Sequence, residues 1–204
     1  MTWNSHVQKV SSKLSKINGV LSRLKRFLPR DILKMIYNAL ILPHLNFGIL
    51  LWGNNTKRIF KLQKWALRSI TLSKYNAHTD PLFISLKLLK VQDIYTLALL
   101  KFYYKYEKES LPNYFNGMFE PVFVSHDHYT RQCNNPVKNV CNTKLAEKSL
   151  RFSLLTAVEN IDDKVIQKVA THSLWGYSNY AKLHLISLYD PKCNLRNCYI
   201  CNNQ

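Results

Sequence analysis

The chain has 204 residues, of which 47% are hydrophobic, so it can bury a core in one or two domains and is not a disordered chain. Its formal net charge is +17, from 29 lysines and arginines against 12 acidic residues. The five glycines form no Gly-rich phosphate-binding motif, and no apolar window reaches the ~18 residues that a membrane-spanning helix needs.

The positive charge is concentrated in the first 79 residues, which hold fourteen lysines and arginines against one acidic residue, Asp31. The rest of the chain holds fifteen against eleven. A strongly basic region of this kind indicates a polyanionic partner, most simply RNA or DNA. The composition leaves open a basic protein whose charge serves solubility alone.

A first helix is predicted between about residues 7 and 28, where apolar residues recur at spacings of three and four. Pro29 and Asp31 then favour the start of a second helix that runs toward Leu42. The positions off the apolar stripe of the first helix carry Lys9, Lys13, Lys16, Arg23 and Arg26.

The most apolar stretch, NALILPHLNFGILLWG, covers residues 38–53. Pro43 cannot continue a helix undisturbed, so we expect a kink or a break and then a short helical piece through Leu51–Trp52. His44 has no acidic or nucleophilic partner nearby in the sequence. We expect it to be a buried, hydrogen-bonded histidine, not a catalytic one.

A third helix is predicted over about residues 56–72. At about 100° per residue, its basic and apolar side chains fall on opposite faces. The basic face holds Lys57, Lys61, Lys64 and Arg68, and the apolar face holds Ile59, Leu62, Ala66 and Ile70. The apolar face would pack on the first two helices, and the basic face is either a solvated surface or a phosphate-binding one.

The remainder of the chain predicts further helices over 81–89, 91–107, 162–170 and 174–188, with an ambiguous segment at 145–158. The aromatic residues of the 91–107 helix are expected in the core. We therefore predict a mainly α fold. Its organisation is a basic helical bundle at 1–72, a second helical region at 80–116, a long linker at 117–144, and a C-terminal region with a Cys-rich tail at 145–204.

An ordered series of segments resembles a known family. TWNSHVQKVSSKLSKINGVLSRLKRFLP, LKMIYNALILPHLNFGILLWG and LQKWALRSI occur in this order, followed by YNAHTDPLF, KLLKVQDIYTLALLKFYYK and an ending with THSLWGYSNY and NCYIC. The series is similar to the region after the palm in reverse transcriptases of jockey-like non-LTR (LINE-type) retrotransposons, and it covers essentially the whole chain. The resemblance implies that the bundle is a thumb, which in the family holds the template–primer duplex. It also implies that the PHLNFGILLWG segment belongs to the core of the thumb helices, so that His44 ties the bend to a neighbouring element.

The resemblance also implies where catalysis would reside. In the family, the palm carries the aspartates that bind two divalent metal ions, and those segments are expected upstream of this chain. The adjacent pair Asp162–Asp163 lacks the aromatic residue of the family's metal motif, because Asn160 stands in its place. We expect Asp162 to cap a helix, no catalytic residue and no resident cofactor. The chain would then be a polymerase fragment that is not itself an enzyme, with the missing palm and fingers as partners.

The C-terminal tail offers a second kind of site. Cys193, Cys198 and Cys201 include the Cys-x2-Cys spacing of zinc ligands, but a tetrahedral site needs a fourth ligand. The candidates for it are His172, His184, Cys133 and Cys141. Because the N-terminus lacks a secretory signal, we expect an intracellular protein, nuclear or cytoplasmic, with no membrane contact, whose cysteines are thiols or metal ligands. The alternatives are a basic helical adaptor without a nucleic-acid role and a zinc-dependent C-terminal binding module.

Overall fold

The structure is a computed structural model that describes residues 3–115, 143 and 146–190. These residues are mainly helical and include no strand, which confirms the predicted mainly α class. They form two compact units, one within Met1–Tyr95 and Lys182–Gln204 and the other within Thr96–Ala181. No helix among them combines the length and the apolar character that crossing a membrane requires.

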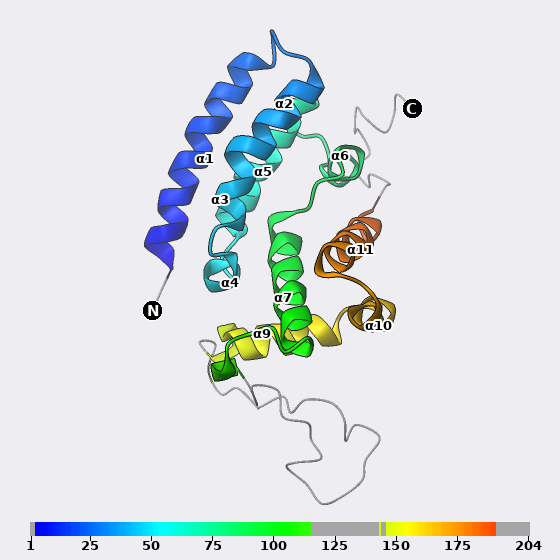
Figure 1. Cartoon of the computed structure of the whole chain (residues 1–204). Helices are drawn as coiled ribbons and strands as arrows, with labels where there is room; N and C mark the ends of the chain where they lie inside the picture. Colours follow the sequence, from blue (N-terminus) through cyan, green and yellow to red (C-terminus); the bar gives the residue numbers. More distant parts are fainter. Residues whose placement is uncertain (1–2, 116–142, 144–145, 191–204) are drawn as a thin grey trace, which may run out of the picture. The chain divides into compact units, whose positions relative to one another are not determined.

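The first unit is built on the packing of α1 (Asn4–Leu24) along α5 (Lys57–Ile70). In the view of Figure 1, α5 lies behind α2 and α3. Polar contacts bring the two backbones close: Asn18 Nδ2 donates to the carbonyl oxygen of Leu62 at 2.9 Å, and the hydroxyls of Ser22 and Ser69 lie 3.3 Å apart. The predicted stripe of the first helix supplies the apolar side of this contact. Its buried members are Val7, Val10, Leu14 and Leu21.

The segment 30–52 continues as one helical column through Pro43 and breaks later than expected. Pro43 has no N–H to donate and its ring would meet the carbonyl of Ala39 in a regular helix. A wider π turn directly before the proline accommodates this change, and the break comes at Phe47 and Gly48, where the backbone turns extended and then left-handed. The elements are α2 (Arg30–Ile36), η1 (Tyr37–Ile41), α3 (Leu42–Asn46) and the predicted short piece, α4 (Ile49–Trp52).

Glycine is needed at two positions of the apolar stretch, for a different physical reason at each. Gly48 adopts φ +60°, in the left-handed region that favours glycine. Gly53 lies against other atoms: a Cβ there would stand 2.2 Å from Cδ2 of Tyr95 and 2.6 Å from the carbonyl oxygen of Ile49. Glycine at 48 therefore allows the chain to turn, and glycine at 53 allows α4 to pack closely on Tyr95.

A buried amide joins three elements of this unit. Gln63 on α5 donates through Nε2 to the hydroxyl of Tyr37 and to the carbonyl of Leu89, both at 2.8 Å. Its Oε1 accepts from the backbone N–H of Val91 at 2.9 Å, at the start of α7 (Val91–Glu107). Gln63 is only 1% exposed, so these bonds replace those that water would make. α6 (Asp80–Leu86) packs beside α5 in the same unit.

The second unit contains the later part of α7 and the beginning of α11 (Leu174–Ser187). Tyr104 and Tyr177 pack with ring centroids 5.2 Å apart, and the Tyr104 hydroxyl donates to the carbonyl of His172 at 2.7 Å. Of the aromatic residues predicted in the core, Tyr95 and Tyr104 are buried. Phe102, Tyr103 and Tyr106 are half-buried, so the prediction is confirmed only for the first two. The other elements are η2 (Asn113–Phe115), η3 (Ala146–Lys148), α9 (Leu150–Glu159) and α10 (Asp163–Thr171).

The boundaries of the two units do not coincide with the predicted ranges 1–72, 80–116 and 145–204. Residues 80–95 and 182–190 pack with the N-terminal bundle. The physical reason is a set of long-range hydrogen bonds, namely those of Gln63 and the bond from the Lys90 N–H to the Tyr189 hydroxyl at 3.0 Å. The predicted linker lies outside the described residues except for residue 143.

Replacing the glycines by alanine tests this account of the apolar stretch. Gly53→Ala should lower the free energy of unfolding by about 1–3 kcal/mol through overpacking against Tyr95, and Gly48→Ala by about 1 kcal/mol through its left-handed φ. Gly19 is the matched control: it lies within α1, and a methyl group added there would meet nothing within 4 Å, so Gly19→Ala should stabilise by about 0.5–1 kcal/mol. Urea unfolding measures all three, and equal effects of Gly19→Ala and Gly53→Ala would contradict the account.

Candidate nucleic-acid interface

Helix α5 presents its basic residues on the face opposite the core, as predicted. Ile59, Ala66 and Ile70 are buried, and Leu62 is half-buried beside α1. Lys57 and Lys61 are exposed, whereas Lys64 and Arg68 are half-buried. The four cations therefore share one side of the helix, held outward by the burial of the other side.

Three of these cations, all but Lys57, line a hollow of about 730 Å³, here named the α5 groove. Lys61, Lys64 and Arg68 come from α5, and Lys25 comes from the end of α1. None of the lining residues is acidic. The remaining ones are Leu62, Trp65, Ser69, Ser73, Tyr75 and Asn76.

The electrostatics of the α5 groove favour an anion. Burial lowers the pKa of Lys64, and the neighbouring positive charge of Arg68 lowers it further. Burial also lowers the pKa of Arg68. The nearby carboxylate of Asp80 acts on Lys64 but already lies 2.8 Å from the Lys90 ammonium. The cations of the groove thus repel one another, and a bound phosphate would relieve that repulsion.

Arg68 has a positioning role within the α5 groove. Its Nε and Nη2 donate to the carbonyl oxygen of Ala77 at 3.2 and 2.9 Å. Its guanidinium carbon also lies 5.8 Å from the centroid of the Tyr75 ring, within the range of a cation–π contact. Arg68 therefore holds the turn at 71–79 against α5, and this turn forms one wall of the groove.

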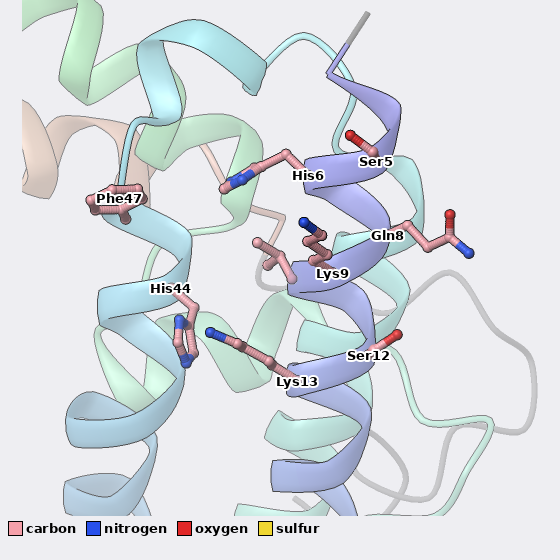
Figure 2. Close-up of a pocket in the computed structure, with 9 residues that line it drawn as sticks. Ser5, His6, Gln8, Lys9, Ser12, Lys13, His44 and Phe47 are labelled. Atoms are coloured by element: carbon pink, nitrogen blue, oxygen red, sulfur yellow. The ribbon is translucent and has the colours of Figure 1, made fainter.

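A second basic cluster lies between α1 and α3, in a hollow of about 610 Å³ that we name the α1–α3 hollow. Figure 2 shows Lys13 extending from α1 toward His44 on α3, with Lys9 one turn away on α1. The imidazole of His6 packs beside Trp52 with ring centroids 5.9 Å apart. The His44 ring is half-buried and makes no hydrogen bond among the described residues, so it does not tie the bend in the predicted way.

Five of the nine predicted basic residues line one of these two hollows. Lys9 and Lys13 line the α1–α3 hollow, and Lys61, Lys64 and Arg68 line the α5 groove. Four predicted residues line neither hollow, and all four are exposed: Lys16, Arg23, Arg26 and Lys57.

Sequence reasoning missed several residues of the α5 groove. On a helical wheel Lys25 falls at the edge of the apolar stripe, at the same angle as Val7, and Trp65 falls between the basic and apolar faces, so periodicity selects neither as a binding residue. Tyr75 and Asn76 lie in a turn whose position depends on the Arg68–Ala77 hydrogen bonds. The adjacency of a tryptophan to Lys64 was the only local signal for an aromatic wall.

The prediction for Asp162 is confirmed. Its side chain accepts from the backbone N–H of Lys164 at 2.9 Å and caps α10, with Asp163 in the first helical turn. In the described part of the chain, no three histidine, cysteine or acidic side chains gather as a metal site. Cys193, Cys198 and Cys201, with the candidate ligands Cys133 and Cys141, lie outside the described residues.

Comparison with known proteins found no relative of this chain: no family model, curated protein or solved structure matches it. The fold and the α5 groove therefore have to be interpreted from their own chemistry. The resemblance to LINE-type reverse transcriptases is carried by the sequence motifs alone.

A half-buried titratable cluster lies outside the α5 groove, where the chain after α11 meets the start of α7. The Tyr189 hydroxyl donates to Asp93 and accepts from the Lys90 N–H, while the Lys90 ammonium lies 4.2 Å from the Tyr189 ring centroid. Burial raises the pKa of Asp93 above its ordinary value and outweighs the opposing effect of the Tyr189 hydrogen bond. These contacts join the chain after α11 to the start of α7, so we assign the cluster a structural role.

The raised pKa of Asp93 predicts a pH dependence of stability. Because the pKa of Asp93 is raised in the folded protein, its neutral form stabilises the folded state at low pH. As pH rises, the unfolded chain ionises Asp93 before the folded protein does, and this stabilisation is lost as pH passes through the folded pKa. Asp93→Asn keeps an oxygen that can accept from Tyr189 and removes the buried charge. Its free energy of unfolding minus that of wild type should therefore increase between about pH 4 and about pH 7.

Urea unfolding at the two pH values measures this difference. Glu147→Gln, at an exposed position, controls for the loss of one negative charge. A difference for Asp93→Asn that shrinks as pH rises would contradict the burial argument.

Proposed function

We propose that this chain binds template–primer nucleic acid, an RNA or DNA duplex, through its phosphate backbone, as the thumb and C-terminal portion of a LINE-type reverse transcriptase. The observation that carries the proposal is the α5 groove, where Lys25, Lys61, Lys64 and Arg68 line one hollow with no acidic residue. The order of the sequence motifs supports the family, and the excess of basic residues before residue 80 supports the kind of partner.

The dimensions of the basic face suit a phosphate backbone. From Lys57 to Arg68 the helix rises about 16 Å at about 1.5 Å per residue. One strand of a duplex places a phosphate every ~3.4 Å along its axis, so this face spans several phosphates. Lysine and arginine contacts to phosphates position a protein without reading base edges, and we therefore expect little sequence preference.

The same chain would depend on the rest of the polymerase for catalysis. In this proposal, the divalent metal ions belong to the missing palm, and the chain alone is not an enzyme. We place the surface for the palm and fingers along α2, η1, the C-terminal end of α3 and α4, where large apolar side chains are exposed. They are Met35, Leu40, Phe47 and Leu51. The site of action would be the nucleus or the cytoplasm.

Charge reversal on the basic face tests the proposal. The triple variant Lys57→Glu, Lys61→Glu, Lys64→Glu should weaken binding of any duplex sequence about tenfold or more at about 0.1 M salt. It should also reduce the slope of log K against log salt by about 0.9 for each phosphate contact that is lost. Fluorescence anisotropy with a labelled duplex, measured over a salt series, gives both quantities. Arg68 is left unchanged because it holds the turn at Ala77.

A matched variant controls for the change in net charge. Lys105, Lys148 and Lys164 are exposed lysines of the second unit, and reversing all three changes the charge by the same amount. If both triple variants lose the same affinity, the binding is a general effect of charge and the adaptor alternative gains support. Unchanged affinity in the α5 variant would contradict the proposed surface.

A further inference from the structure

The α5 groove carries two aromatic side chains that phosphate binding does not use. Tyr75 is 91% exposed and Trp65 is 41% exposed, and both line the hollow together with the cations. Trp65 follows Lys64 on α5, and Tyr75 lies in the turn that Arg68 holds. Tyr75 gains little from burial in the free protein, and Trp65, although more than half covered, keeps a large aromatic surface exposed.

Aromatic faces bind bases that have left a duplex. Within a duplex the bases stack on one another and present only their edges, so a protein that contacts paired phosphates needs cations alone. Proteins that bind single strands combine a basic groove with aromatic rings on which successive bases stack. The α5 groove has this combination, since Lys61, Lys64, Trp65 and Tyr75 line the same hollow.

Two further features suit a nucleotide. The volume of about 730 Å³ falls within the roughly 300–1,000 Å³ of pockets that hold small ligands. Asn76 also lines the groove, and its side-chain amide offers both donors and an acceptor to the edge of a base.

We propose that the α5 groove holds an unpaired nucleotide at the end of a duplex, with its base stacked on Trp65 and Tyr75 and its phosphates on Lys61 and Lys64. This inference rests on the proposed phosphate-binding function and names its substrate more closely. The preferred ligand is a duplex with a single-stranded extension, such as a template that continues beyond its primer.

Binding to three labelled probes tests this inference: a blunt duplex, the same duplex with a short single-stranded extension, and the single strand alone. Wild-type protein should bind the extended duplex about tenfold more tightly than the blunt one, as expected for one stacked base. Tyr75→Ala and Trp65→Ala should each remove most of this preference, which is the ratio of the affinities for the two duplexes measured with the same variant.

The second unit supplies matched controls for the two substitutions. Tyr114 is 91% exposed and Trp175 is 78% exposed, and neither lines the α5 groove. Tyr114→Ala and Trp175→Ala should keep the preference for the extended duplex. Circular dichroism and the thermal midpoint of each variant establish that it is folded.

The outcomes separate this inference from the proposed function. Salt-dependent binding of the blunt duplex without any gain from the extension would overturn the stacking inference and leave the phosphate surface intact. Equal losses in the groove variants and in their controls would also overturn it. Absence of binding to all three probes would overturn the proposed function itself.

Discussion

The arrangement of the first unit depends on the buried side chain of Gln63. Its amide is satisfied by the hydroxyl of Tyr37, the carbonyl of Leu89 and the N–H of Val91. These three bonds fix α5 about its own axis, because a rotated helix would leave a buried amide and a helix N-terminus without partners. With one face of α5 held in this way, its lysines must face away from the core.

The helices and their apolar faces were largely predictable because they follow from local periodicity. The predicted 91–107 helix coincides with α7, and the capping role of Asp162 followed from its position before a helical pattern. The path around Pro43 was not predictable, because a kink, a break and a π turn can each accommodate the hydrogen bond that a proline removes from a helix. The structure has the π turn, and Tyr37 at its start accepts a hydrogen bond from Gln63.

The candidate interface was predictable in its charge and not in its shape. Helical spacing placed Lys61, Lys64 and Arg68 together. It could not show that Lys25 joins them from another helix, or that the chain after α5 turns back and places Tyr75 beside Arg68. Such features arise from tertiary contacts between segments that are distant in sequence, and a single sequence carries no signal for them.

The central claim is that the α5 groove is where nucleic acid contacts this chain. Lysine acetylation with and without a bound duplex, followed by mass spectrometry, tests it most directly. The account predicts that the duplex protects Lys25, Lys61 and Lys64 and leaves Lys105 and Lys164 as reactive as in the free protein. Equal protection of all five lysines, or protection confined to the last two, would contradict it.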